Sequence, residues 1–514
     1  MSQAVIPVKQ RDVVEYGSRR TLIVIGIMLA TLMQTLDSTI VNVALPVIQG
    51  NLGATLDESA WVVTGYIISA VIVIPLTPWL QMRFGRRQYY SLAIVGFTVA
   101  SMFCGVAGSI GDLIFWRIVQ GLFGGGLVAT AQATLSDTFP REKLGASQAL
   151  FAMGAIVGPT IGPTLGGWLT DNLAWNYVFF INLVPGIIAA IIIFTQLKNP
   201  NDPAHIPVDG VGLGLLATGL GSLQYVLDEG QRNDWYDSGV IWLLSGTALI
   251  GLMSFAFWEL WGTNRPIVDL RALKYRSVAA GAAMGFAIGA SLFGSTVLLP
   301  QFVQGVLGFT ATLSGELIFV RALFIAVLAP IAARVASSGR IDTRILLGAG
   351  FIMLAVSNWM QVGVTTTDSG FWTLVPPLIL SGIALGLLFT PLSIAVLGSI
   401  PPAMIPKSSA FTSLSLQLGG SFSTAALVTL LANRTAFHQD RLASTINHAS
   451  PAVTNALQSH VGIGHIYQLV LQQASTQAYG DASIALTILS FLLTPLVFVL
   501  AKPRPMRGAS VSVE

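Results

Sequence analysis

Fourteen apolar runs of about 20 residues dominate the sequence and constrain its fold more than any other feature. A helix that crosses a membrane needs roughly 20 mostly apolar residues, because the hydrocarbon core is about 30 Å thick and each residue rises 1.5 Å. We therefore predict an all-α membrane protein with fourteen transmembrane helices. The runs lie near residues 22–46, 60–81, 89–108, 111–135, 145–169, 175–197, 209–228, 239–261, 278–303, 312–336, 341–363, 372–398, 408–432 and 482–501.

Composition excludes the other classes of protein. Of the 514 residues, 53% are hydrophobic and 10% are charged, whereas a soluble globular chain carries about 25% charged residues. A soluble core cannot bury this much apolar surface, which argues against a cytosolic enzyme and a disordered chain. The single cysteine, Cys104, leaves no intramolecular disulfide and no thiolate metal cluster. The net charge of +3 argues against a nucleic-acid partner.

The positions of Lys and Arg predict the orientation of the chain. If the N-terminus lies inside, 21 of the 26 basic residues fall in inside segments and three, Arg232, Arg434 and Arg441, fall outside. Arg117 and Arg321 fall within spans. This asymmetry follows the positive-inside rule. We predict a multi-pass membrane protein with both termini in the cytoplasm.

A weak internal repeat predicts two similar halves. The segment 51–61 precedes the second span as 306–317 precedes the tenth, and each is followed by an apolar run, a proline and a Gly-Arg pair. Parallel repeats of this kind occur in transporters, with the substrate path between the halves. The predicted divisions are a cytoplasmic N-terminal segment (1–21), an N-terminal six-helix bundle (22–197), two additional transmembrane helices with linkers (198–275), a C-terminal six-helix bundle (276–501) and a cytoplasmic tail (502–514).

Residues 433–481 form a long polar segment that we predict to be an outer loop inside the C-terminal half. Its Gln-rich part, 466–479, is predicted to form a short amphipathic helix. The four histidines of the segment lack the tight spacing of metal ligands, so we interpret them as solvated loop residues and predict no metal site.

Asp37 and Arg117 are the most informative charges within the spans. A charge at the bilayer centre costs about 2.5–3.5 kcal/mol on insertion scales, so it usually faces a cavity or a partner. Burial favours a protonated carboxyl group, which makes Asp37 a candidate proton carrier. Arg117 keeps its proton and needs an acceptor, and helix counting places it at a depth similar to that of Asp37. The alternatives are a structural hydrogen bond at Asp37 and a static ion pair.

The fifth span and the loop after the second span carry candidate conformational motifs. Small residues recur every four positions in "GAIVGPTIGPTLGG" (154–167), which predicts close helix packing, and its two prolines predict a bend or hinge. Packing alone is the alternative. In "PWLQMRFGRR" (78–87), Gly85 permits a tight turn, and the arginines could pair with helix C-termini or with Asp137 to latch the inner side. The alternative is that they only mark topology.

Glu316 and Arg321 both lie in the tenth predicted span. They are five residues apart, about 500° of helical rotation, so they point to different faces. Either could line the cavity. The alternative for Glu316 is a position at the outer interface.

Together these motifs identify a family resemblance that covers nearly the whole chain. The segments "LDSTIVNVALP" (36–46), "RIVQG" (117–121), "GPTIGPTLGG" (158–167), "WNYVFFINLVPG" (175–186) and "LLPQFVQGVLGFTA" (298–311) resemble the 14-span drug:proton antiporters of the major facilitator superfamily, most closely the EmrB-type multidrug exporters. The resemblance implies a major facilitator fold with two additional helices. It also implies that 433–481 is a periplasmic loop and that a membrane-fusion adaptor and an outer-membrane channel are partners.

Site residues follow from the resemblance and from the charges within the spans. The predicted proton-coupling residues are Asp37, Arg117 and Glu316. The predicted substrate-binding residues are Asp37, Gln34, Asn42, Gln120 and Arg321. The predicted conformational motifs contain Arg83, Gly85, Arg86, Gly121, Gly154, Gly158, Pro159, Gly162, Pro163, Gly166 and Gly167. The inner-loop motif departs from the family pattern, with Pro78 in place of Gly and Met82 in place of Asp, which removes a charge expected in the inner latch.

The predicted function is proton-coupled multidrug efflux by alternating access. The substrates are amphipathic or lipophilic compounds, the proton is the coupling ion, and no other cofactor, metal or catalytic residue is predicted. One alternative is a proton-coupled exporter of a single physiological solute, such as a fatty acid, siderophore or metabolite. The other is a sensor or assembly scaffold that moves nothing.

Overall fold

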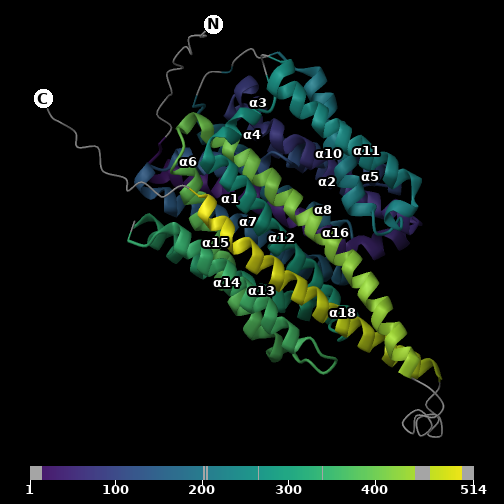
Figure 1. Ribbon diagram of the computed structural model, residues 1–514. Coiled ribbons are helices and arrows are strands. Elements are labelled where there is room, and N and C mark those ends of the chain that lie inside the picture. The colour runs from purple at the N-terminus through teal and green to yellow at the C-terminus, as the bar shows by residue number, and fades with distance from the viewer. Residues whose placement is uncertain are drawn as a thin grey trace, which may run out of the picture.

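The computed structural model describes residues 14–200, 203, 207–263, 266–338, 340–445 and 463–500. Throughout these ranges the secondary structure is helical, and the long helices run side by side (Figure 1). Thirteen helical segments in the described ranges are long and apolar enough to cross a membrane. The one predicted span that is not among these thirteen is the third, 89–108, which corresponds to α4 (Arg86–Gly105). Its first turn, Arg-Arg-Gln, makes it more polar than the others, but it packs between α5 and α9 in the same way.

The N-terminal half contains the first six predicted spans. Its second, fourth and sixth spans are each interrupted, at Ile74–Leu76, at Gly125 and Gly126, and at Ile181 and Asn182 respectively. Besides α4, this half consists of α1 (Gly17–Leu52), α2 (Leu56–Val73), η1 (Ile74–Leu76), α3 (Thr77–Phe84), α5 (Ile110–Gly124), α6 (Leu127–Thr138), η2 (Arg141–Lys143), α7 (Leu144–Asn172), α8 (Tyr177–Phe180) and α9 (Leu183–Gln196).

The C-terminal half contains the last six spans. Its elements are α12 (Arg276–Gly305), α13 (Ala311–Ser337), α14 (Thr343–Val364), α15 (Phe371–Leu397), η6 (Pro402–Met404), α16 (Ile405–Thr445), α18 (Ile463–Leu493) and η7 (Thr494–Val499). Together with the N-terminal half and the helix pair between them, it confirms the predicted all-α fold class.

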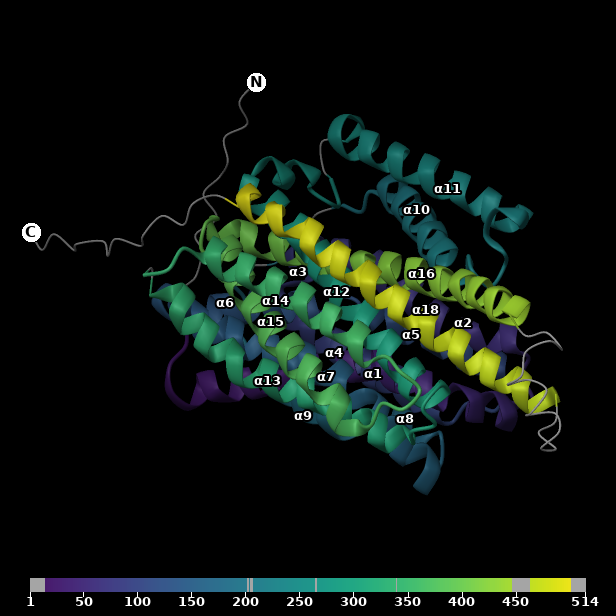
Figure 2. The same cartoon turned by 60° about the horizontal axis from the view of Figure 1, so that its bottom comes forward.

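Two additional helices lie between the halves in sequence. They are α10 (Gly210–Glu229) and α11 (Gly239–Phe257), with η3 (Trp235–Asp237) between them and η4 (Trp258–Gly262) and η5 (Leu270–Lys274) after them. Helix α10 packs against α2 and α16, and Gln224 donates a 2.9 Å hydrogen bond to Ser421. Helix α11 is outermost (Figure 2), and its Leu243 is 70% exposed. An exposed apolar face of this kind fits contact with lipid.

The predicted outer loop 433–481 is largely helical, which corrects that expectation. Helix α16 continues to Thr445 and α18 begins at Ile463, so the two last spans extend well past their apolar parts. Arg434 and His438 of α16 lie 2.6 and 2.7 Å from Asp481 of α18, and these polar contacts hold the extensions together. The helix predicted at 466–479 exists, but it is the start of α18. His448 and His460 lie outside the described residues.

Both ends of the described chain lie at the same end of the bundle, which we call the terminal face. Glu15 donates its backbone N–H to the carbonyl of Thr138 at the end of α6, and Arg344 at the start of α14 donates to the carbonyl of Leu500. The two halves also meet near this face. Gln132 of α6 donates a 3.2 Å hydrogen bond to Ser393 of α15. An apolar cluster there joins Ala133, Leu144 and Ala152 to Val278, Leu392 and Val396.

Candidate functional site

The centre of the N-terminal half holds a fully buried ion pair. Arg117 of α5 donates from Nη1 to Oδ2 of Asp37 on α1 over 2.7 Å. Asp37 is 0% exposed and Arg117 is 1% exposed. Helix counting predicts a similar depth for the two residues, and in the structure they are in direct contact. A pair without access to water loses little of its attraction to solvent screening, so it holds α1 and α5 together.

Two neutral amides complete the coordination of the Asp37 carboxylate. Gln120 donates to Oδ1 over 3.0 Å, and Asn182 donates to the same oxygen over 2.8 Å. Asn182 also donates to Ser101 of α4 over 2.9 Å. Every hydrogen bond that reaches the carboxylate therefore comes from an N–H donor. This arrangement suits the ionised carboxylate, which accepts a hydrogen bond at each of these contacts.

Helix α2 contacts Arg117 through Val62 and Tyr66. The carbonyl of Val62 accepts a 3.0 Å hydrogen bond from Arg117 Nε. The ring of Tyr66 lies 4.1 Å from the Arg117 guanidinium carbon, a cation–π distance. Gly121, one helical turn after Arg117, faces the same part of α2: a Cβ there would collide with the Tyr66 carbonyl oxygen and the Ser69 hydroxyl. The absence of a side chain at Gly121 thus lets α5 approach α2.

The small residues of the fifth span face the helix that carries Asp37. A Cβ atom at Gly158 would lie 2.9 Å from the backbone nitrogen of Leu36, and one at Gly166 would lie 2.7 Å from the carbonyl oxygen of Ile40. The predicted small face of α7 is therefore a contact surface for α1. The helix continues through Pro159 and Pro163 without interruption. The glycines of α7 thus bring its backbone against the backbone and the short Thr35 and Thr39 side chains of α1, so a movement of α7 affects α1 directly.

The opposite side of α7 contacts the C-terminal half. A Cβ at Gly145 would meet Ser337 of α13 near the terminal face, and a Cβ at Gly315 of α13 would meet Thr164 of α7 near the other end. The two helices thus pack against each other along most of their length. Helix α7 lies between the Asp37 helix and the second half of the molecule.

The terminal face contains the predicted arginine contact. Gly85 has a φ of +83°, a left-handed conformation that connects α3 to α4 and favours glycine. Arg86, the first residue of α4, forms a 2.6 Å ion pair with Asp137 of α6 and a 3.2 Å hydrogen bond with Gln81. Arg83 lies over the rings of Trp79 and Phe84 instead. The contact that we expected at Asp137 is thus made by Arg86.

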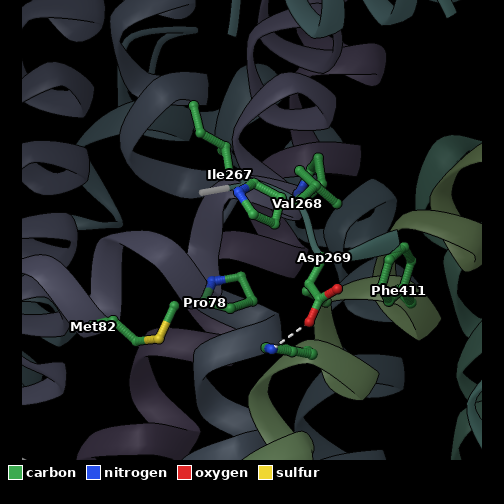
Figure 3. A pocket seen from close by; sticks show the side chains of 10 residues that line it. Pro78, Met82, Ile267, Val268, Asp269 and Phe411 are labelled. Atoms are coloured by element: carbon green, nitrogen blue, oxygen red, sulfur yellow. Dashed lines mark hydrogen bonds and ion pairs between the residues drawn. The ribbon is translucent and has the colours of Figure 1, made fainter. Parts of the chain in front are cut away.

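A cavity of about 220 Å³ lies where the two halves and the linker after α11 meet (Figure 3). Pro78 and Met82 line it from the N-terminal half, and Phe411 lines it from α16. Asp269 of the linker forms a 2.7 Å ion pair with Lys407 at the start of α16. The linker is therefore fixed to the C-terminal half where that half abuts the second span.

The remaining predicted site residues lie outside the Asp37 network. Gln34 of α1 donates a 3.3 Å hydrogen bond to Tyr66 and borders the site. Asn42, two turns further along α1, is exposed. Glu316 is exposed on α13 and forms no ion pair within the part of the chain that the structure describes. Arg321 is buried in the C-terminal half. The roles assigned to these residues stay predictions.

Sequence reasoning did not single out three residues of the network: Tyr66, Ser101 and Asn182. All three are neutral, and neutral polar residues are common within spans, so composition gives no signal for them. The position of Asn182 was detectable in principle. It stands inside the segment 175–186, which carries part of the family resemblance, directly before a helix start.

Two helical halves, an additional pair of helices and a buried ion pair near the middle of the first half define a multi-pass membrane transporter. The sequence profile of the Major Facilitator Superfamily matches residues 27–424. The chain belongs to this superfamily and, by its curated relatives, to the EmrB-type group within it. It is therefore a transporter of small molecules and not an enzyme.

Curated relatives and solved structures agree with this assignment. The multidrug export protein EmrB of Escherichia coli K12 is 35% identical over 460 residues, which are 89% of this chain and 88% of that protein. The fatty acid resistance protein FarB of Neisseria gonorrhoeae is 34% identical over 499 residues, 95% of this chain and 97% of that protein. The crystal structure of the human organic anion transporter MFSD10 matches the fold with a TM-score of 0.58, at 14% identity, over 92% of this chain and 99% of that one.

Proposed function

We propose that this protein is a proton-coupled multidrug exporter of a bacterial inner membrane, with both termini in the cytoplasm. It moves amphipathic or lipophilic compounds outward by alternating access as protons move inward. The names of the EmrB relatives support the substrate range, and the distribution of Lys and Arg supports the orientation.

The Asp37–Arg117 pair carries the proposal for proton coupling. Of the two charged groups, the carboxylate is the one that can accept a proton, because the guanidinium remains charged. A proton on Asp37 removes the negative charge that balances Arg117 and takes up part of the acceptor capacity that Arg117, Gln120 and Asn182 share. Protonation therefore weakens the attachment of α1 to α5 and α9.

Helix α7 supports a route from this event to the second half. It contacts α1 through its glycines and α13 through its other face. A shift of α1 would therefore change how the two halves pack. In the structure the halves are joined near the terminal face by the Gln132–Ser393 hydrogen bond and by an apolar cluster. With the termini in the cytoplasm, these contacts lie on the cytoplasmic side.

The energy available from protons is sufficient for such export. One charge that crosses about 100 mV releases about 2.3 kcal/mol. Since about 1.4 kcal/mol corresponds to a factor of ten, this supports roughly a fifty-fold gradient of a neutral solute per proton. Drug resistance needs no more than this from a pump that faces slow passive leak.

A periplasmic membrane-fusion adaptor and an outer-membrane channel are the proposed partners. The family resemblance supports this, and the helical extensions of α16 and α18 supply a surface for such a contact. They carry the Arg434, His438 and Asp481 cluster beyond the apolar spans. Deletion of the adaptor from cells should abolish resistance conferred by the protein while transport by the purified protein persists.

Transport by purified protein in liposomes tests the proposal. We expect an imposed pH gradient to drive flux of two chemically unrelated compounds, ethidium and decanoate. Flux of one compound alone would favour the single-solute exporter. No gradient-driven flux of either compound, from protein shown to be folded, would favour a scaffold that transports nothing.

A further inference from the structure

Arg321 is a third buried arginine beside Arg86 and Arg117, and unlike them it forms no ion pair with any acid in the part of the chain that the structure describes. It is 2% exposed and lies within α13. Nη1 donates to the Ser295 hydroxyl over 3.0 Å and Nη2 to the Thr296 hydroxyl over 2.7 Å, while Nε has no hydrogen-bond partner. A guanidinium has five N–H donors, so three of them are unused within the described residues.

The repeat places Arg321 in the counterpart of the Asp37 site. Thr55 and Thr310 are the N-caps of α2 and α13, and each accepts a hydrogen bond from the third residue of its helix. Tyr66 and Arg321 follow these caps at the same separation, eleven residues. In the first half, Tyr66 covers an arginine whose charge is balanced by a carboxylate. In the second half the same position is itself the cation, and no described carboxylate lies within ion-pair distance.

A cavity of about 40 Å³ lies beside Arg321, enclosed by α12, α13, α14, α15 and α18. Polar side chains of four helices line it: Ser295, Ser357, Asn358, Gln361, Ser381 and Ser483. Thr365, Tyr479, Phe302 and leucine side chains line the rest. A water molecule occupies roughly 10–15 Å³ by this measure, so the cavity has room for a small ion or the charged head of a larger molecule and not for a whole amphipathic compound.

An isolated charge in a low-dielectric interior is expensive, and buried charges in proteins are normally paired. The hydroxyls beside Arg321 satisfy two of its donors but supply no negative charge. We propose that Arg321 and its cavity bind a small monovalent anion, either chloride or the carboxylate head of an amphipathic acid. The polar side chains provide further donors to that anion, and the apolar side chains would contact the first carbons of an acid.

This inference goes beyond the proposed function, because binding at Arg321 requires neither a proton gradient nor Asp37. Two probes with purified full-length protein separate the two sources of the anion. The first is sodium chloride titrated at constant ionic strength against sodium methanesulfonate, whose anion is bulkier. The second is decanoate compared with decyltrimethylammonium, which has the same tail and the opposite charge. Thermal unfolding midpoints and calorimetric titration report binding.

We expect saturable binding of chloride, of decanoate or of both, and none of decyltrimethylammonium at this site. R321Q should weaken anion binding more than tenfold. R334Q, which removes an exposed arginine from the last turn of the same helix, is the matched control and should change nothing. S483L keeps the arginine but fills the cavity, so it should abolish anion binding even if R321Q folds poorly.

Competition between chloride and decanoate would assign both to one site, and chloride binding alone would define a site for an inorganic anion. The proposal is overturned if neither anion binds saturably, or if R321Q and S483L bind it as tightly as the unmodified protein. A failure of gradient-driven export would leave these results unaffected, because the binding assay involves no gradient.

Discussion

Arg117 Nη1 lies 2.7 Å from Asp37 Oδ2, and neither side chain is more than 1% exposed. The pair links α5 to α1 at a point where Gln120 and Asn182 also converge. One member keeps its charge under all physiological conditions and the other is a carboxyl group. A change of protonation in the pair therefore means a change at Asp37.

Removal of one charge should destabilise the protein strongly. D37N leaves Arg117 buried without a counter-ion, and breaking a buried pair in this way costs about 3–5 kcal/mol. The double variant D37N/R117M removes both charges and should recover most of that loss. Unfolding of the purified variants by denaturant measures both effects. If D37N proves as stable as the unmodified protein, the pair does not hold α1 and α5 together.

The same variants separate a titrating pair from a static one. We expect D37N and D37N/R117M both to lose gradient-driven export by more than tenfold, because neither has a carboxylate that can carry a proton. D171N is the control, since Asp171 is an exposed acid at the end of α7. Recovery of export in the double variant along with its stability would assign the pair a purely structural role.

The sequence predicted the charged part of this site and not the neutral part. A charge within a span is rare and needs a partner, so Asp37 and Arg117 could be paired from their depths alone. Asn182 and Ser101 donate and accept in the same network but carry no such signal. Polarity also misled: 433–445 was predicted as part of a loop and 466–479 as a separate short helix, yet both segments belong to the long helices α16 and α18. The Arg434–Asp481 contact spans 47 residues, beyond the reach of local pattern.

Because α7 packs closely on α1, a side chain added at Gly162 should destabilise the protein, and a second substitution on α1 should restore its stability. A methyl group at Gly162 would collide with the Thr39 hydroxyl, while the next nearest atoms are 3.2 Å away. G162A should therefore lower the free energy of unfolding by about 1–3 kcal/mol and reduce export. The second change in G162A/T39A removes the colliding hydroxyl and should restore both. G348A, at a helical glycine with open space around it, serves as the control.

A covalent link across the Asp269–Lys407 ion pair should hold the linker to α16. Cys104 is buried and is the only cysteine, so D269C/K407C can be joined selectively with a short bis-maleimide. If the linker separates from α16 during the cycle, the link should reduce export at least tenfold. Linking R276C to F498C, both within the C-terminal half, controls for the chemistry. Undiminished export after complete linking would show that the two segments move as one.

The extensions of α16 and α18 depend on Asp481, which accepts from Arg434 and His438 across the two helices. The Arg434 and Asp481 side chains are 37% and 25% exposed, so solvent screens the interaction, and pairs of this kind contribute up to about 1 kcal/mol. D481N retains the shape of the side chain and removes its charge. Amide hydrogen exchange in 430–445 and 463–480 should then accelerate about fivefold, the factor that corresponds to about 1 kcal/mol, while exchange in α1 and α5 stays unchanged.

D440N, at an exposed acid on α16 that forms no ion pair among the described residues, should leave exchange as it is. Equal acceleration in D440N would attribute the effect to net charge, and no acceleration in D481N would mean that apolar contacts alone hold the two extensions together.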